Sequence, residues 1–246
     1  MQLNNRFIFC EKEIISAGEI ADVQIKPTCE YRKYHICLLT KKQIRAVTQR
    51  AISVDKADVR SALVDRIMLC FKNTALPKTP FVLSVILSLC DGLDFSLINE
   101  AVVLEQFMEL LLGKNSPTEA ATHNYDYRAK EDFLIALVTE MLNKNHFYLE
   151  YQEFSNFIAE YHTRKGFDLV ETKYDRVFFL NGVLVRINQI VRFRYNCMIE
   201  YYLAKKASQE PEFLSRILEN GNYIHYTNEL RYYTGLNRRS LNILKI

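Results

Sequence analysis

Apolar and polar residues alternate along residues 183–193, in the run VLVRINQIVRF. The alternation continues on both sides of Asn188-Gln189, and asparagine tolerates the positive φ that a tight two-residue turn needs. This pattern predicts a β-hairpin. The residues expected to face the protein interior are Val183, Val185, Ile187, Val191 and Phe193, and those expected to point outward are Arg186, Arg192 and Arg194.

Directly after the hairpin the spacing of apolar residues changes from two to three or four. They recur at Tyr195, Met198, Ile199, Tyr202 and Leu203, which places them on one face of a helix. A hairpin followed by such a helix predicts the end of a winged-helix domain, and the hairpin is its wing.

Helical spacing, flanked by capping residues, also covers most of the chain before and after this region. Short apolar runs at residues 6–10 and 35–39 predict two strands. The predicted helices cover residues 41–51, 80–90, 99–112, 126–142, 154–166, 174–180, 211–221, 223–235 and 239–246, and a further helix capped by Asp55 or Asp58 ends at residue 74. Loop 114–124 separates two groups of these helices and is the best candidate for a linker.

The composition is that of a globular protein with long helices. The 246 residues are 49% hydrophobic and 25% charged, and glycine occurs only 7 times. The net charge of +3 gives no strong electrostatic reason to expect nucleic acid or membrane as a partner. The amino-terminal residues do not resemble a signal peptide, and no apolar run approaches the length of a membrane span, so we expect a cytoplasmic protein.

The six cysteines form no Cys-x-x-Cys pair, and most lie in apolar runs, as expected of reduced thiols in the core of a cytoplasmic protein. Cys29, His35 and Cys37 are candidate metal ligands by residue type. They lack a fourth ligand at metal-site spacing, so no metal site is predicted.

Two stretches resemble the STAND/NACHT-type NTPases. The run VRFRYNCMIEYYLA (191–204) is similar to their winged-helix signature, in which a strand ending in Phe-x-His precedes a helix with Glu-Tyr-Phe-x-Ala. The run LPKTPFVL (76–83) is similar to the proline motif that opens a helix of their nucleotide-binding module. The order of the two stretches and the distance between them also fit this family.

The resemblance implies positions for nucleotide contacts on this chain. Pro80, with Thr79 beside it, corresponds to the proline that packs on adenine in the family. Tyr195 stands where the family has a histidine that reaches the β-phosphate of ADP, and a tyrosine cannot carry the positive charge of that histidine. Lys12 stands about where the family has a sensor arginine.

The sequence contains neither a phosphate-binding loop nor an acidic pair that would hold Mg²⁺. No catalytic or metal-ligating residue is therefore assigned, and no enzymatic activity is expected of this chain alone. ATP or ADP with Mg²⁺ is expected only together with a partner or an upstream region that carries a phosphate-binding loop. We interpret the chain as the C-terminal portion of such an NTPase.

The predicted fold is mainly α with small β content. It consists of a helical bundle and a winged-helix domain with a β-hairpin wing, preceded by a remnant of an α/β NTPase core. The predicted boundaries are residues 1–52 for the end of that core, 53–114 for a helical subdomain, 125–207 for the winged helix, and 208–246 for the start of a helical repeat or sensor region.

The resemblance implies a regulatory portion that clamps a nucleotide-binding module and links it to a sensor, with a role in antiviral defence. Its expected partners are a phosphate-loop-bearing NTPase half or further copies of itself, and an unknown sensed ligand. The alternative is a stand-alone winged-helix protein that binds nucleic acid. Basic residues available for that role are Arg192, Arg194, Lys205, Lys206, Arg231, Arg238 and Arg239.

Overall fold

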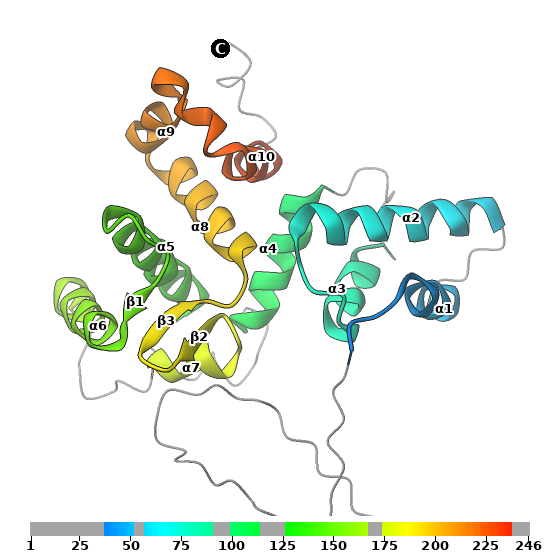
Figure 1. Cartoon of the computed structure of the whole chain (residues 1–246), viewed down its shortest axis with the longest axis horizontal. Coiled ribbons are helices and arrows are strands. Elements are labelled where there is room, and N and C mark those ends of the chain that lie inside the picture. Colours follow the sequence, from blue (N-terminus) through cyan, green and yellow to red (C-terminus); the bar gives the residue numbers. More distant parts are fainter. Residues whose placement is uncertain (1–36, 52–56, 91–98, 114–125, 167–173, 238–246) are drawn as a thin grey trace, which may run out of the picture.

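A computed structural model describes residues 37–51, 57–90, 99–113, 126–166 and 174–237 of the chain. These residues are mostly helical, and their strands form one small antiparallel sheet. The predicted fold class, mainly α with small β content, is therefore confirmed. Figure 1 shows the helices of residues 41–111 on one side of the molecule and the sheet with its helices on the other.

The first four predicted helices form close to their predicted bounds. They are α1 (Lys41–Ala51), α2 (Ala57–Thr74), α3 (Pro80–Cys90) and α4 (Glu100–Leu111). The hydroxyl of Thr40 accepts the Gln43 N–H at 3.3 Å, and the Gln43 side chain in turn accepts the Thr40 N–H at 2.9 Å. This reciprocal pair satisfies two N–H groups that the start of α1 would otherwise leave unbonded. Asn99 caps α4 in a similar way, through a 2.9 Å bond from the Val102 N–H.

The strand predicted at residues 35–39 is wrong where it can be checked. Residues 37–39 form no strand; the N–H of Leu39 donates instead to the carbonyl of Lys78 at 2.7 Å. A single bond to a loop does not make a sheet, because a strand needs a partner that runs alongside it. The strand predicted at residues 6–10, and Lys12, lie outside the described residues. The α/β core proposed for residues 1–52 therefore stays a prediction, as do the other domain boundaries.

The winged-helix part follows the predicted order of elements. It comprises α5 (Tyr127–Asn143), β1 (Leu149–Glu150), α6 (Tyr151–Lys165), α7 (Tyr174–Leu180), β2 (Leu184–Ile187) and β3 (Ile190–Phe193). The sheet order is β1-β3-β2, so the second hairpin strand pairs on both sides. Asn188 opens the two-residue turn with φ of 57°, as predicted. Strand β1 was not predicted.

The predicted facing of the hairpin residues is wrong for Arg186 and Ile187 of β2, whereas Val183 and Val185 are buried as predicted. Leu184 lies opposite Phe193 and Arg186 lies opposite Val191, so these four side chains share one face of the sheet. Val185 and Ile187 lie on the other face, which we call the outer face. The cause is the two-residue turn, which places Ile187 opposite Ile190 and thereby fixes every later pair.

Helix α8 (Asn196–Gln209) is the centre of the C-terminal part. It packs against α4, α5, α9 (Pro211–Leu218) and α10 (Thr227–Leu236). The predicted apolar face is buried apart from Tyr195, which is half-buried, and so are Cys197, Tyr201, Ala204 and Ala207 outside that face. Helix α8 is therefore surrounded by protein along much of its length, as its position in Figure 1 shows.

The helix predicted to begin at residue 223 begins at Thr227 instead. A 3-10 segment, Glu219–Ile224, occupies the preceding residues, and Asn220 and Gly221 there both have positive φ. Two successive residues of this kind interrupt α-helical hydrogen bonding and delay the start of α10. The helix predicted at residues 239–246 lies outside the described residues. Within the described ranges, no helix has both the length and the apolar character needed to cross a membrane.

Candidate functional site

Thr79 and Pro80, the residues predicted to face adenine, lie at the start of α3. The Thr79 hydroxyl accepts the Val82 N–H at 3.3 Å, and Pro80 is the first residue of the helix. Proline suits this position because its missing N–H would have no partner within the helix. The local structure accounts for both residues as a helix start.

Tyr195, the residue predicted to face a phosphate, immediately precedes α8 and is half-buried. Its hydroxyl accepts a 3.2 Å hydrogen bond from Nε of Arg194. In the part of the chain that the structure describes, no hydrogen bond links Tyr195 to Thr79 or Pro80. These residues lie at the starts of two separate helices, and their nucleotide contacts stay predictions.

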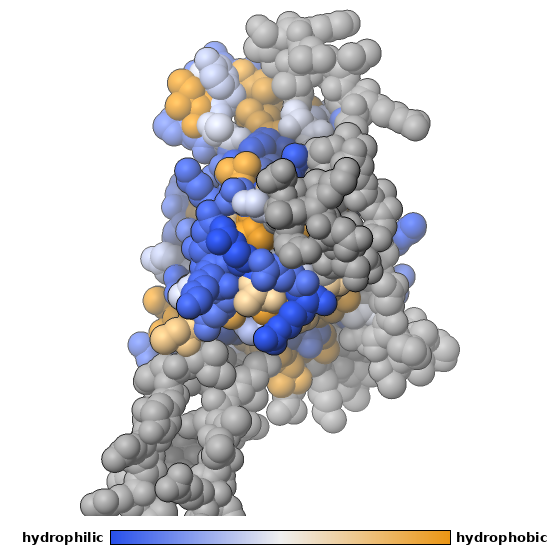
Figure 2. Space-filling model, turned by 90° about the vertical axis from the view of Figure 1, so that its right-hand side faces the viewer, coloured by the Kyte–Doolittle hydropathy of each residue, from blue (hydrophilic) through white to orange (hydrophobic). Residues whose placement is uncertain are grey.

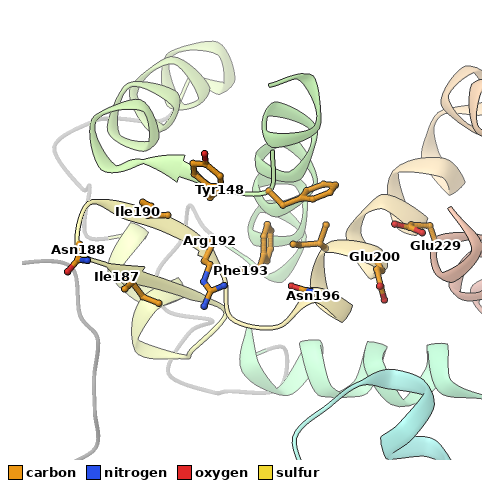
Figure 3. Close-up of a pocket in the computed structure, with 11 residues that line it drawn as sticks. Tyr148, Ile187, Asn188, Ile190, Arg192, Phe193, Asn196, Glu200 and Glu229 are labelled. Carbon is orange, nitrogen blue, oxygen red and sulfur yellow. The ribbon is translucent and has the colours of Figure 1, made fainter. Parts of the chain in front are cut away.

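A groove of about 550 Å³ lies beside the outer face of the sheet, and Figure 3 shows the residues around it. Four parts of the chain form it: the segment before β1, the hairpin, the first turns of α8, and the first turn of α10. Its lining residues are Phe147, Tyr148, Ile187, Asn188, Ile190, Arg192, Phe193, Asn196, Ile199, Glu200 and Glu229. We call this the wing groove.

One end of the wing groove is apolar. Ile187 and Ile190 form the cross-strand pair next to the hairpin turn, and they are 39% and 41% exposed. Phe147 and Tyr148, which precede β1, are each 42% exposed. Four large apolar side chains thus remain accessible on one small surface, which is the usual character of a surface that binds another protein or a ligand.

The other end of the wing groove is acidic. Glu200 on α8 accepts a 2.9 Å hydrogen bond from the Asn228 side chain, and Glu229 lies on the facing turn of α10. The pKa of Glu229 is raised to about 7, mainly by burial; the charge of Glu200 adds to the rise, and a backbone hydrogen bond opposes it. A cation placed here would relieve the repulsion between the two carboxylates.

Two of the three arginines of the wing are engaged by their own chain. The guanidinium of Arg186 lies 3.6 Å from the ring centroid of Tyr151 and donates to the carbonyl of Asn188 at 3.0 Å. Arg194 donates to Tyr195, as described above. Arg192 is exposed in the wing groove, and among the described residues it makes no hydrogen bond or ion pair.

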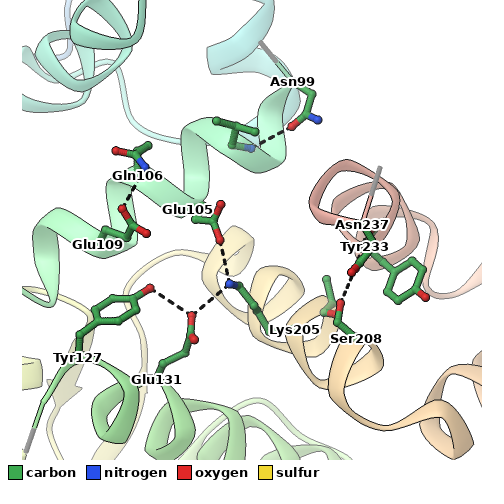
Figure 4. Close-up of polar contacts among 12 residues, drawn as sticks. Asn99, Glu105, Gln106, Glu109, Tyr127, Glu131, Lys205, Ser208, Tyr233 and Asn237 are labelled. Carbon is green, nitrogen blue, oxygen red and sulfur yellow. Dashed lines mark hydrogen bonds and ion pairs between the residues drawn. The ribbon is translucent and has the colours of Figure 1, made fainter. Parts of the chain in front are cut away.

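A polar cluster joins the N-terminal helices to the winged-helix part, as Figure 4 shows. The ammonium of Lys205 on α8 lies 2.9 Å from Glu105 on α4 and 3.3 Å from Glu131 on α5. The hydroxyl of Tyr127 donates to Glu131 at 3.1 Å. Burial opposes the charge of Lys205, but the hydrogen bonds and charges of the two glutamates outweigh it and hold the pKa of Lys205 above its usual value. We call this cluster the Lys205 junction.

The most basic helix of the described chain is α1, away from the wing. Its sequence KKQIRAVTQRA contains four basic residues and no acidic one, and only Ile44 and Thr48 are buried. Figure 2 views the molecule from the side on which α1 and α2 lie and shows a largely hydrophilic surface there. Lys41 pairs with Asp65 at 2.7 Å. Of the residues predicted to form a basic surface near the C-terminal end, Lys205 and Lys206 are held in ion pairs and Arg231 donates to the carbonyl of Asn73.

The described residues contain no group of three or more side chains suited to hold a metal ion. Cys37 is exposed, whereas Cys70 and Cys197 are buried free thiols. The metal candidates Cys29 and His35 lie outside the described residues. Burial raises the pKa of Cys70 and of Cys197 to about 12, so both thiols stay protonated and unreactive near neutral pH.

The sequence analysis did not find the wing groove. The available signal was the run HFYLEY (146–151), in which Phe147 and Tyr148 precede a short alternation of apolar and polar residues. Comparison of this chain with known protein families, with curated proteins and with solved structures found no match. The resemblance to STAND/NACHT-type NTPases therefore rests on the two sequence stretches alone.

Proposed function

We propose that this chain is the regulatory and interaction portion of a cytoplasmic STAND/NACHT-type signalling NTPase. In this proposal the winged-helix part docks on a nucleotide-binding module and clamps it, and the following helices link it to a sensor. The observation that carries the proposal is the wing groove, whose lining exposes Phe147, Tyr148, Ile187 and Ile190. A surface of this kind favours a protein partner, because burial of apolar area drives most protein association.

The same surface weighs against duplex DNA as the main partner. A wing that contacts phosphates needs cations available at its tip, whereas the guanidinium nearest this turn, that of Arg186, is held by Asn188 and Gln189. Helix α7 directly precedes the hairpin, which is the position of the recognition helix in DNA-reading winged helices. It has seven residues and ends in the exposed, apolar Leu180.

The Lys205 junction supports a mechanical role. A clamp must transmit force between the parts that it connects, and Lys205 joins α8 to α4 and α5 through partly buried ion pairs. Gly235 on α10 adds to this contact. A Cβ atom at position 235 would lie 2.6 Å from Cβ of Ala101, so α10 and α4 approach too closely for a larger residue.

The proposal assigns nucleotide chemistry to a phosphate-loop-bearing partner or upstream region and defence signalling to the complete assembly, including self-oligomers. We expect the purified chain to hydrolyse neither ATP nor GTP, because its sequence supplies no phosphate-binding loop. Hydrolysis that co-purifies with the chain through successive columns would contradict this expectation.

The test is co-expression with a phosphate-loop-bearing product encoded upstream of, or next to, this chain. We expect the two to co-purify, and we expect Ile187→Asp with Ile190→Asp to abolish the complex. Ile224→Asp is the matched control, since Ile224 is 66% exposed on the 3-10 segment and lies outside the wing groove. If the two proteins still co-purify after the double substitution, the wing groove is not the surface that docks on the nucleotide-binding module.

A nucleic-acid-binding protein remains the second candidate, and the observation that favours it is the basic surface of α1. Lys41 and Lys42 occupy the first turn of this helix, where the helix dipole disfavours cations. Binding through α1 would depend on charge alone and would not involve the wing.

A further inference from the structure

We infer that the wing groove binds a short linear segment of its protein partner, with an arginine or lysine at one end of the segment and large apolar side chains at the other. This inference rests on the proposed function, in which the wing groove is the docking surface, and it specifies what that surface accepts. Three observations carry it: the size of the groove, the order of chemistry along it, and the state of its charged groups.

The wing groove has a volume of about 550 Å³. This volume lies within the range of sites that enclose small ligands, so it accommodates a few side chains and not the face of a folded domain. Its lining residues come from the segment before β1, the hairpin, α8 and α10. An occupant therefore lies between these elements, as a short linear segment can.

Chemistry changes along the wing groove in one direction. Ile187 and Ile190 lie at one end, and Glu200 and Glu229 lie at the other, as Figure 3 shows. The two isoleucines are 39% and 41% exposed, so an occupant with large apolar side chains would bury them further. Apolar contact at one end and charge at the other fix the direction in which a segment lies.

The acidic end favours a cation from outside the described chain. Among the described residues, no ion pair includes Glu200 or Glu229, and Glu200 accepts only the hydrogen bond from Asn228. Glu229 has a pKa raised to about 7, mainly by burial, so its charged form is disfavoured by its surroundings. An arginine or lysine side chain would stabilise both carboxylates through charge-assisted hydrogen bonds.

Arg192 lies between the two ends of the wing groove and is exposed. Its guanidinium offers hydrogen-bond donors to the backbone carbonyls of an extended segment. The same positive charge repels a cation in the middle of the segment. The expected occupant therefore carries its basic side chain next to Glu200 and Glu229 and uncharged residues beside Arg192.

Peptide display on the purified chain tests this inference. A library of random linear peptides is first depleted on the Ile187→Asp with Ile190→Asp chain and then selected on the parent chain. We expect the retained peptides to share a basic residue that uncharged positions separate from two or more large apolar residues. The tightest of these peptides is then synthesised with blocked ends, so that its basic side chain is the cation under test.

A double-mutant cycle pairs that basic side chain with the acidic end of the groove. At pH 8, above the pKa of about 7 of Glu229, Glu200→Gln with Glu229→Gln should weaken peptide binding about tenfold, as calorimetry measures it. Citrulline for arginine, or norleucine for lysine, should weaken binding to the parent by a similar factor and have little effect on the Gln variant. Glu212→Gln is the matched control, since Glu212 is exposed on α9 and lies outside the wing groove.

Three results would overturn the inference: no peptide is retained, the retained peptides share no basic residue, or the two changes weaken binding independently. The proposed function has a separate outcome, since it fails if Ile187→Asp with Ile190→Asp leaves the partner complex intact. Loss of that complex together with an empty peptide selection would leave the proposed function standing and overturn only the linear segment, because the groove would then bind a folded surface.

Discussion

The Lys205 junction and the wing groove both combine charged and aromatic residues, but they differ in what completes them. At the junction, Lys205 lies between Glu105 and Glu131, and Tyr127 adds a hydrogen bond. The cation and both carboxylates come from the chain itself. The junction therefore needs nothing further and joins α4, α5 and α8.

In the wing groove, Glu200 and Glu229 lie at the same end with no cation of the described chain paired to either. Ile187 and Ile190 lie open at the other end, and Phe147 and Tyr148 lie open along one wall. Two carboxylates side by side and apolar area in contact with water both cost free energy. The cost is relieved when another group covers the site. In the proposed function, the junction therefore serves stability and the groove serves binding.

Val191→Pro is expected to reduce stability more than any of the substitutions that follow. Val191 is fully buried in β3 and lies opposite both Leu149 and Arg186. A proline in this central strand removes a ladder hydrogen bond and should lower the free energy of unfolding by about 3 kcal/mol or more. Urea denaturation measures the change. Unchanged stability would contradict the winged-helix assignment.

Lys205→Met is expected to cost about 2 kcal/mol, because it leaves two partly buried carboxylates without their cation. Adding Glu105→Gln and Glu131→Gln should recover most of this loss. Lys144→Met is the control, since the pair of Lys144 with Glu153 is more exposed and should contribute less than about 1 kcal/mol. Equal losses for the two lysines would show that the junction is no stronger than a surface pair.

Local parts of the structure could be predicted from the sequence because their causes lie within a few residues. Thr40, Asn99 and Asp126 cap the helices that follow them, and Gly113 and Gly166 adopt the positive φ expected at helix ends. Each of these features depends on backbone groups no more than one helical turn away.

The wing groove and the junction could not be predicted in this way. The groove joins Tyr148 to Glu229, and the junction joins Glu105 to Lys205 across 100 positions. Strand β1 has two residues, too few for a period to appear, and it exists because Leu149 pairs with Val191. Such contacts depend on how distant helices pack together, and a pattern within a short stretch of sequence does not determine this packing.

Glu229→Gln should change how stability depends on pH. Because the pKa of Glu229 is raised from 4.5 to about 7, the folded chain holds a proton that the unfolded chain has lost between these values. The favourable contribution of this proton is complete below pH 4.5 and is lost as pH rises through about 7.

The Glu229→Gln variant should lack this decline and should exceed the parent by about 1–2 kcal/mol at pH 8, after allowance for partial exposure. Glu200→Gln should reduce the decline without removing it, since burial is the larger cause. Urea denaturation between pH 4 and pH 8 measures both variants. A parent whose stability does not fall between pH 5 and pH 8 would refute the account of the acidic end.

Ala75→Gly is expected to have a small stabilising effect, of about 0.5–1 kcal/mol. Ala75 has φ of 52°, a conformation that favours glycine, in the loop that leads to Thr79 and Pro80. Gly166→Ala is the opposite change at φ of 71° in open space and should destabilise by a similar amount. Thermal unfolding compares the two, and a loss of stability in Ala75→Gly would contradict the assigned strain.

The most direct test of the claim that the wing meets protein and not DNA is a titration with duplex DNA at several salt concentrations. We predict binding weaker than about micromolar at physiological salt, the range of non-specific contacts. Arg192→Glu with Arg194→Glu should leave this binding nearly unchanged, whereas Lys42→Glu with Arg45→Glu on α1 should weaken it. The account would be contradicted by a salt-sensitive complex of nanomolar affinity that is lost when Arg192→Glu and Arg194→Glu are combined. The wing would then be the DNA-binding surface.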